Sequence, residues 1–310
     1  MRIITAKTFF IFALSLFFSG SAPAQEGGWN ELANKAQALY RERRYDEGVL
    51  AAQEALKVAQ QTFGADHLNM AQSLNDLAEL YSAQRRYDEA ELSFKRSLEI
   101  RKNHLGPEHS DVAVSYNNLA ALYSAQGKYT DAEPLYQKAL AIWEKTLGPD
   151  HAYVGGCLNN LAELYKTQGL YGEAGSFFKR SLSILEKTMG AGHPYVAGSL
   201  NNLGELYRLQ GRYAEAEEAL KRSLAIREES LGKDHPDVAT SLNDLAILYH
   251  SQGKYDKAEP LYKRSLKIMR KTLGPDHPHV ATTTENLAKL HEAQGKPKET
   301  ATPAGSTSPV

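Results

Sequence analysis

The sequence predicts an all-α protein of stacked helix pairs, an α-solenoid, and three observations support this prediction. A histidine returns every 42 residues at six positions, so the 310-residue chain is an array of equal units. Each unit contains two segments in which apolar residues recur at helical spacing. Glycine or proline marks most of the segment ends. The six histidines are His67, His109, His151, His193, His235 and His277.

The first helix of each unit is indicated by apolar residues at positions i, i+3, i+4 and i+7. Leu158, Leu161, Ala162 and Tyr165 follow this spacing, which places their side chains on one face of a helix. Proline directly follows some of the histidines, as at Pro236. It suits the first turn of a helix because a missing N–H costs nothing there. We therefore expect a helix to begin after each histidine.

The second helix of each unit follows a short turn that contains glycine, such as Gly127. Its apolar residues keep helical spacing, as in the run from Tyr213 to Arg227. In most units this helix ends at Leu-Gly, for instance at Gly148, where glycine adopts the left-handed conformation that closes a helix. Pro134 and Pro260 lie near the start of their helices, where a proline disturbs little.

These residues also carry a family resemblance. The longer pattern L-N-N-L-A-x-L-Y…L-G-x-D-H-P resembles the 42-residue repeats of the kinesin-light-chain type of tetratricopeptide repeat (TPR), over residues 30–293. The resemblance implies a right-handed TPR superhelix of about six helix pairs and a C-terminal cap helix. The period alone would also admit HEAT or armadillo repeats, but the motif favours TPR. This motif, Leu-x2-Leu-Ala-x2-Tyr and then Ala-x3-Phe, occurs at Leu74, Leu77, Ala78, Tyr81, Ala90 and Phe94.

The N-terminus has the three-part plan of a secretory signal peptide. A basic start precedes the apolar run Phe9 to Phe18, and small residues lead to Ala24, which predicts cleavage after residue 24. The run is shorter than the roughly 20 residues of a membrane span, so we expect no span after cleavage. Retention of the leader as an anchor is the alternative. The leader predicts an exported protein, periplasmic or secreted, and favours a bacterial source.

The repeat pattern sets the remaining boundaries. Residues 295–310 are rich in Pro, Ser, Thr and Gly and predict a disordered tail. Residues 25–28 form a short linker before the solenoid at 29–294. We expect repeats at about 29–66, 67–108, 109–150, 151–192, 193–234 and 235–276, and a cap helix at 279–293.

Charge and cysteine content exclude some functions. Without Arg2 and Lys7, which the leader carries, the 36 basic residues become 34 against 37 acidic ones. This balance argues against nucleic-acid binding. Cys157 is the single cysteine, so no internal disulfide forms. The other repeats hold serine or threonine in its place, which favours a small packed residue over a catalytic thiol.

No motif indicates catalysis, a cofactor or a metal. The sequence has no nucleophile elbow, phosphate loop or dinucleotide fingerprint, so we expect neither an enzyme nor a cofactor. Stacked helices lie about 8–10 Å apart, so the histidines that precede them in neighbouring repeats are too far apart to share an ion with bonds of about 2 Å. We expect no metal site and a structural role for these histidines.

The candidate binding site is the inner, concave face of the solenoid. At about 100° per residue, the second asparagine of the Asn-Asn pair lies nearly opposite the core positions of the first helix. In proteins that this chain resembles, such asparagines bind extended peptides, and an amide both donates and accepts hydrogen bonds, as a peptide group requires. The alternative is that they bond neighbouring helices and hold the stack. The predicted groove residues are Asp76, Asn118, Asn160, Asn202, Asp244 and Asn286, then Asn117, Asn159, Asn201 and Asn243, and the flanking Gln72, Glu79, Glu163 and Glu205.

The sequence thus predicts an exported scaffold that binds a protein or peptide partner in this groove. Acidic residues outnumber basic ones around the groove, which favours a basic or neutral partner segment. One alternative is a structural envelope component that assembles with itself as a homo-oligomer. The other is a noncatalytic subunit of a secreted enzyme. A repeat fold alone does not name the partner.

Overall fold

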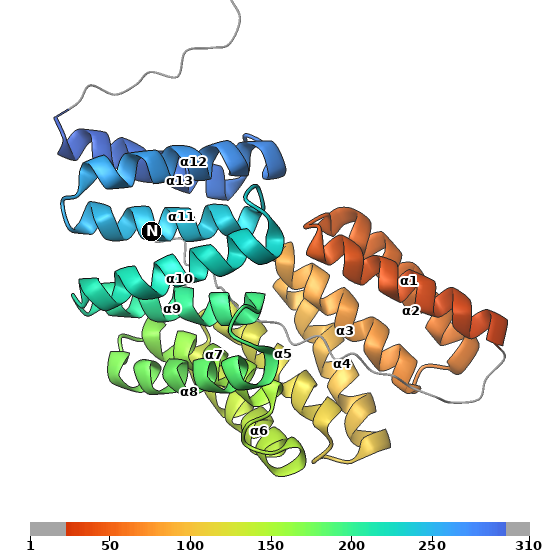
Figure 1. Ribbon diagram of the computed structural model, residues 1–310. Helices are drawn as coiled ribbons and strands as arrows, with labels where there is room; N and C mark the ends of the chain where they lie inside the picture. The colour runs from red at the N-terminus through yellow and green to blue at the C-terminus, as the bar shows by residue number, and fades with distance from the viewer. Residues whose placement is uncertain (1–22, 296–310) are drawn as a thin grey trace, which may run out of the picture. The chain divides into compact units, whose positions relative to one another are not determined.

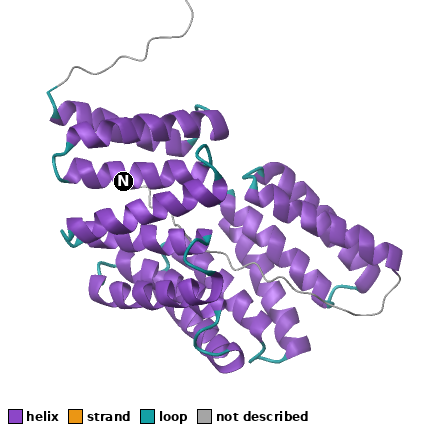
Figure 2. Ribbon diagram, viewed as in Figure 1, coloured by secondary structure: helices purple, strands orange, loops and turns teal. Residues whose placement is uncertain are grey.

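The computed structural model describes residues 23–295, in which thirteen helices follow one another and no strand occurs (Figures 1 and 2). Residues 1–22, with most of the predicted leader, and residues 296–310 of the predicted tail lie outside this range. The helices are α1 (Pro23–Arg41), α2 (Tyr45–Phe63), α3 (Leu68–Ala83), α4 (Tyr87–Leu105), α5 (Ser110–Ala125), α6 (Tyr129–Leu147), α7 (Ala152–Thr167), α8 (Tyr171–Met189), α9 (Pro194–Leu209), α10 (Tyr213–Leu231), α11 (Pro236–Ser251), α12 (Tyr255–Leu273) and α13 (Pro278–Ala293).

The helices confirm the predicted architecture of six pairs and a cap helix. We call the odd-numbered helices A helices and the even-numbered ones B helices. The pairs run from α1–α2 to α11–α12, and α13 is an A helix that follows the last pair. The chain divides into two compact units, the first ending at Ile184 and the second beginning at Leu185. None of the described helices is long and apolar enough to cross a membrane.

The A helices line the inner face of each unit. In the first unit α1 contacts α3, α3 contacts α5 and α5 contacts α7, and in the second α9 contacts α11 and α11 contacts α13. Within the described residues, α2 and α4, α4 and α6, and α10 and α12 make no such contacts. In a curved stack of helix pairs, the helices that contact their counterparts in the next pair lie on the shorter, inner side of the curve. Each unit therefore has an inner face of A helices and an outer face of B helices.

The periodic histidines begin the A helices from α3 onward. Each is the N-cap residue, and its side-chain Nδ1 accepts a hydrogen bond from the backbone N–H two residues later, at 3.1 to 3.2 Å. Accepting at Nδ1 places the ring proton of a neutral imidazole on Nε2. The cap satisfies one of the N–H groups that a helix start leaves unpaired. These contacts confirm the structural role that the sequence predicts for the histidines.

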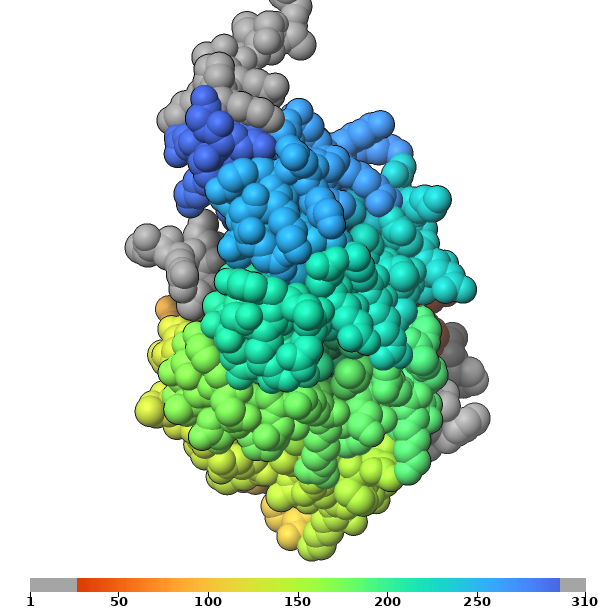
Figure 3. Space-filling model, turned by 60° about the vertical axis from the view of Figure 1, so that its left-hand side comes forward, coloured from red at the N-terminus to blue at the C-terminus, as the bar shows by residue number. Residues whose placement is uncertain are grey.

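The core lies between A and B helices and is filled by apolar side chains. Tyr136 and Trp143 of α6 are fully buried against Leu158 and Cys157 of α7. The Cys157 thiol donates to the carbonyl oxygen of Tyr136 at 3.4 Å, and burial raises the pKa of the thiol far above its usual range. Cys157 is therefore a packed, unreactive residue, as the sequence predicts. In the second unit, Leu242 of α11 and Met269 of α12 belong to a corresponding buried apolar cluster. Figure 3 shows the helices of this unit in space-filling form.

Candidate functional site

The asparagine pairs of the first unit join neighbouring A helices. Asn118 Nδ2 on α5 donates to Asn75 Oδ1 on α3 at 3.1 Å, and Asn160 Nδ2 on α7 donates to Asn117 Oδ1 on α5 at 3.1 Å. Each bond joins the second position of a pair to the first position of the preceding pair, 43 residues earlier. We call this series the asparagine ladder. It holds successive A helices in one register along the inner face.

The second unit contains the same ladder with an aspartate in it. Asn201 Nδ2 on α9 donates to Asp244 Oδ2 on α11 at 2.7 Å, and Asn286 Nδ2 on α13 donates to Asn243 Oδ1 at 3.4 Å. Both bonds again span 43 residues. Asp244 is therefore satisfied by an amide of the preceding A helix.

The predicted groove residues differ in how far they are buried. The following are buried: Asn117, Asn118, Asn159, Asn160, Asn201, Asn202 and Asp76. The ladder bonds support the interpretation that the asparagines hold the stack, and peptide binding by them stays a prediction. Half-buried are Gln72, Glu163, Glu205, Asn243, Asp244 and Asn286. Glu163 forms an ion pair with Lys166 of the same helix at 2.9 Å.

An acidic pair lies at the first end of the ladder. Asp76 and Glu79 are three residues apart on α3, with 4% and 1% of their surface exposed. Glu79 Oε1 accepts from Asn75 Nδ2 at 2.8 Å and from Asn118 Nδ2 at 3.0 Å. The carboxylate of Glu79 is thus tied into the ladder.

Asp76 holds the second position of the first pair, and its carboxylate is incompletely bonded. Its Oδ1 accepts from Gln72 Nε2 at 2.8 Å and, over 3.5 Å, from Gln37 Nε2 on α1. Its Oδ2 is buried and has no hydrogen-bond partner. The ladder position 43 residues earlier is Ala33, because the first repeat lacks the asparagine pair. Asn201 donates its side-chain amide to Asp244, but Ala33 has no such amide to donate to Asp76.

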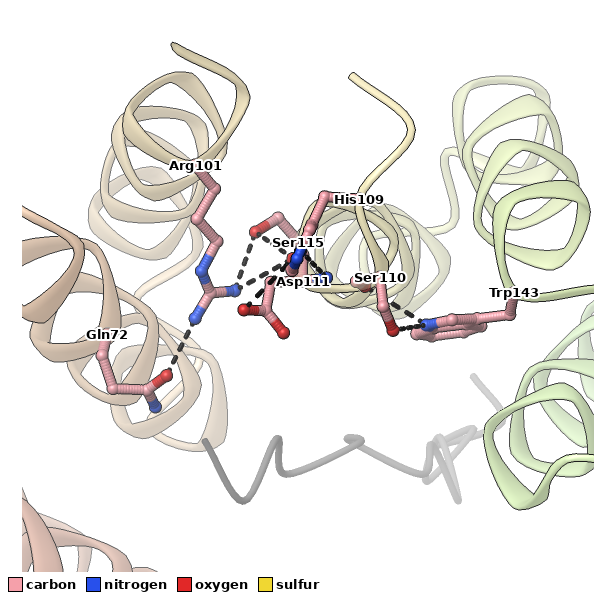
Figure 4. A network of polar contacts seen from close by, with 7 residues as sticks. All are labelled: Gln72, Arg101, His109, Ser110, Asp111, Ser115 and Trp143. Carbon is pink, nitrogen blue, oxygen red and sulfur yellow. Dashed lines mark hydrogen bonds and ion pairs between the residues drawn. The ribbon is translucent and has the colours of Figure 1, made fainter. Parts of the chain in front are cut away.

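Arg101 of α4 connects three helices beside this pair. Its Nη2 donates to Gln72 Oε1 on α3 at 2.8 Å, and its Nη1 donates to Ser115 Oγ at 2.9 Å and to the Asp111 carbonyl oxygen at 3.4 Å on α5. Figure 4 shows the guanidinium between the two A helices. Trp143, which occupies the same position in the next B helix, lies on the other side of α5 and donates to Ser110.

Burial controls the protonation of the acidic pair. It raises the pKa of Asp76 to about 7, although the amide of Gln72 and the charge of Arg101 act in the opposite direction. Burial, and then the charge of Asp76, raise the pKa of Glu79 well above its usual range. Two acids share the nearby cation Arg101, so the cluster retains a proton near neutral pH.

Arg101 is the functional residue that the sequence reasoning missed. Arginine occupies this B-helix position here and at Arg227, whereas Trp143, Leu185 and Met269 occupy it in three other repeats. A cation among large apolar residues indicates a buried polar partner. The described residues contain no group of three or more His, Cys, Asp or Glu residues placed to hold a metal ion.

The outer face carries one apolar feature. Leu50 on α2 and Leu92 on α4 are 67% and 73% exposed and lie 42 residues apart at the same position of their B helices. The later B helices have Pro134, Ser176, Glu218 and Pro260 there. The outer leucines are therefore a second surface to test for partner binding.

Comparisons with known proteins agree with this architecture. The tetratricopeptide repeat family model matches residues 30–103, 111–187, 195–271 and 249–299. No curated protein matches the chain. A crystal structure of putative kinesin light chain TPR-like repeats from Podosopora anserina is 28% identical, with a TM-score of 0.55, over 67% of this chain and 98% of that one.

Two further solved structures share the fold at lower identity. BtubC (BKLC) from P. vanneervenii is 22% identical, with a TM-score of 0.58, over 93% of this chain and all of that one (100%). NprR in complex with its cognate peptide NprX is 14% identical, with a TM-score of 0.63, over 90% of this chain and 77% of that one. From the matched repeats and the helix pairs we conclude that the chain belongs to the tetratricopeptide repeat family.

Proposed function

We propose that this protein is an exported scaffold that binds an extended segment of a partner protein along the inner face of its A helices. TPR arrays are protein-interaction scaffolds, and their stacked repeats offer long surfaces. The observation that carries the proposal is the concentration of polar side chains on the inner face, where the asparagine ladder runs. NprR, which shares the fold, was solved with a bound peptide, and this supports a peptide as the ligand class.

The half-buried acids are the groups best placed to reach a ligand. Glu163 on α7 of the first unit is partly exposed, and so are Glu205 on α9 and Asp244 on α11 of the second unit. The ladder beneath them fixes the spacing of the A helices within each unit. An extended chain that crosses the A helices within either unit then meets acids, so the scaffold favours a basic or neutral segment.

The proposal places the protein outside the cytosol, with residues 1–24 removed and 295–310 as a free tail. The support is the three-part pattern of the leader. Mass spectrometry of the protein recovered from its natural source tests this part. A chain that begins at Gln25 is expected, and an intact N-terminus would show that the leader is retained.

Peptide selection tests the binding proposal. A random library of displayed nine-residue peptides is selected against the chain, and affinity is measured by fluorescence anisotropy. The inner variant Glu163→Ala/Glu205→Ala is expected to weaken binding at least tenfold, because it removes partly exposed acids from the inner face. The matched outer variant Leu50→Ser/Leu92→Ser is expected to bind as the native chain does.

Two other outcomes would count against the inner face. Loss of binding only in the outer variant would move the site to the B helices. The ladder variant Asn118→Ala/Asn160→Ala/Asn202→Ala is informative only if it still unfolds cooperatively. If it then binds as the native chain does, the asparagines serve the stack and not the ligand.

A further inference from the structure

The first rung of the asparagine ladder is unfilled. In the second unit the carboxylate of Asp244 receives the amide of Asn201 at 2.7 Å. In the first unit Asp76 holds the same place on α3, but Ala33 stands where the donor would be. Its Oδ2 is consequently buried without a partner. A buried acceptor of this kind is rare and costs free energy unless something fills the position.

The charged groups around Asp76 Oδ2 favour a cation beside it. Glu79 adds a second buried carboxyl one turn along α3, and Arg101 of α4 is the guanidinium that faces both acids. The other titratable groups that face the cluster are Tyr40 of α1, near Glu79, and Asp111 of α5, near Arg101. With both acids ionised, the cluster carries one uncompensated negative charge. Either a proton or a cation has to balance it.

We infer that Asp76 and Glu79 form a subsite for a lysine or arginine side chain of the bound segment. In the free protein a proton occupies this position, and it leaves to solvent when the cation enters. This inference rests on the proposed function, because the cation arrives as part of a segment on the inner face. A cation held by two carboxylates gains charge-assisted hydrogen bonds that a neutral side chain does not.

The approach to the pair runs through two amides. Gln37 of α1 and Gln72 of α3 donate to Asp76 Oδ1, and both are half-buried on the inner side where α1 and α3 meet. Gln37 is held by a contact of 3.5 Å. We expect a cation to reach the carboxyl when these side chains turn aside, and Gln72 then also gives up its contact with Arg101 Nη2.

Among the A helices α3 to α13, α3 alone has an acid at both positions. A basic residue of the ligand therefore has one place to bind, and this fixes the register of the ligand. The two positions are Asp76 and Glu79 on α3, and Asn118/Ala121, Asn160/Glu163, Asn202/Glu205, Asp244/Ile247 and Asn286/Lys289 on the helices that follow. A basic residue of the partner therefore docks at α3, and the rest of the segment continues from there.

The peptides selected against the native chain are the probe for this subsite. They are expected to carry a lysine or arginine at one fixed position. Replacing a selected lysine by norleucine should weaken binding at least tenfold, and Asp76→Asn should give a similar loss. The two changes together should cost no more than either alone, because both remove the same contact. Asp88→Asn makes the same change at an exposed position of the B helix α4, and this control should leave the affinity unchanged.

Proton release gives an independent readout. Titration calorimetry at pH 6.5 in two buffers of different ionisation enthalpy should show about one proton released per bound lysine peptide, and none with the norleucine peptide. If Asp76→Asn fails to fold, the norleucine comparison on the native chain still decides the matter. Equal losses in Asp76→Asn and Asp88→Asn, or binding without proton release, would overturn the subsite.

The experiment separates this inference from the proposed function. Neutral peptides that lose affinity in Glu163→Ala/Glu205→Ala but not in Asp76→Asn would reject the subsite and leave the inner-face site standing. Failure to select any peptide would overturn both.

Discussion

The side-chain amide of Asn118 donates to the side-chain carbonyl of Asn75 at 3.1 Å, from one A helix to the preceding one. The same bond recurs between Asn160 and Asn117, one repeat later. A repeated sequence thus produces a repeated contact, and the contact lies on the inner face. The ladder explains why the polar residues of this face are ordered before any ligand binds.

Breaking the ladder should destabilise the first unit. Asn118→Ala removes the donor to the buried Asn75 Oδ1 and one of the two donors to Glu79 Oε1, which should lower the free energy of unfolding by about 1–3 kcal/mol. Urea denaturation followed by tryptophan fluorescence measures this, since Trp29 and Trp143 both lie in the first unit. Asn286→Ala is the control, measured by circular dichroism. It removes a half-buried bond of 3.4 Å and should cost less than about 1 kcal/mol. Equal costs for the two variants would contradict the ladder.

The stability of the first unit should depend on the protonation of Asp76. Burial raises the pKa of this carboxyl from its ordinary 3.8 to about 7. An acid whose pKa is raised by folding stabilises the fold fully below its unfolded pKa, and this contribution is lost as the pH rises from about 4 through 7. Asp76→Asn should therefore flatten the pH dependence over this range. At pH 8 it should raise the free energy of unfolding by on the order of 2 kcal/mol.

Urea denaturation at pH 5 and pH 8 checks the Asp76 prediction. Asp244→Asn is the control, because the carboxylate of Asp244 already receives an amide. If the free energy of unfolding of Asp76→Asn changes between pH 5 and pH 8 as much as that of the native chain, the proton is held by another group of the cluster.

Arg101 should matter more at high pH than at low pH. Arg101→Met introduces the residue that another repeat has at this position, Met269, and removes the cation that faces two buried acids. At pH 8 the loss should be about 3–5 kcal/mol, since a buried charge is left without its partner. At pH 5, below the raised pKa of Asp76, less negative charge faces the guanidinium, so the loss should be smaller than at pH 8. Chemical denaturation at the two pH values makes the comparison, and a loss independent of pH would refute the charge argument.

The histidine caps should be replaceable by another capping residue. His151→Ala removes the acceptor for the N–H of Tyr153 and should cost about 1 kcal/mol. His151→Asn keeps a side-chain acceptor at the N-cap and should stay within about 0.5 kcal/mol of the native chain. Thermal unfolding of both variants decides this. A large loss in the asparagine variant would mean that the imidazole contributes by packing and not by its cap.

Local patterns made the helices predictable. The 42-residue period, the apolar spacing and the histidine caps each act within one repeat, so the order of the helix pairs and the cap helix follows from them. The burial of Cys157 is of the same kind, because serine or threonine fills that place elsewhere. Each of these features depends on neighbours along the chain.

The contacts between repeats could not be predicted from the helical projection of a single helix. The angle between Asn118 and the core positions of its own helix says nothing of how closely the next A helix approaches, and it is that approach that buries the asparagine. Arg101 bonds Gln72, 29 residues earlier, and Ser115, 14 residues later. The open rung at Asp76 depends on the register that places Ala33 opposite it.

Photo-cross-linking tests the central claim most directly, namely that the inner face of the A helices binds the partner segment. A benzophenone amino acid is placed at Glu205 on the inner face or at Leu92 on the outer face, and a selected peptide is irradiated with each protein. The account predicts that the peptide is cross-linked from position 205 and not from position 92. Cross-linking from position 92 alone would contradict it.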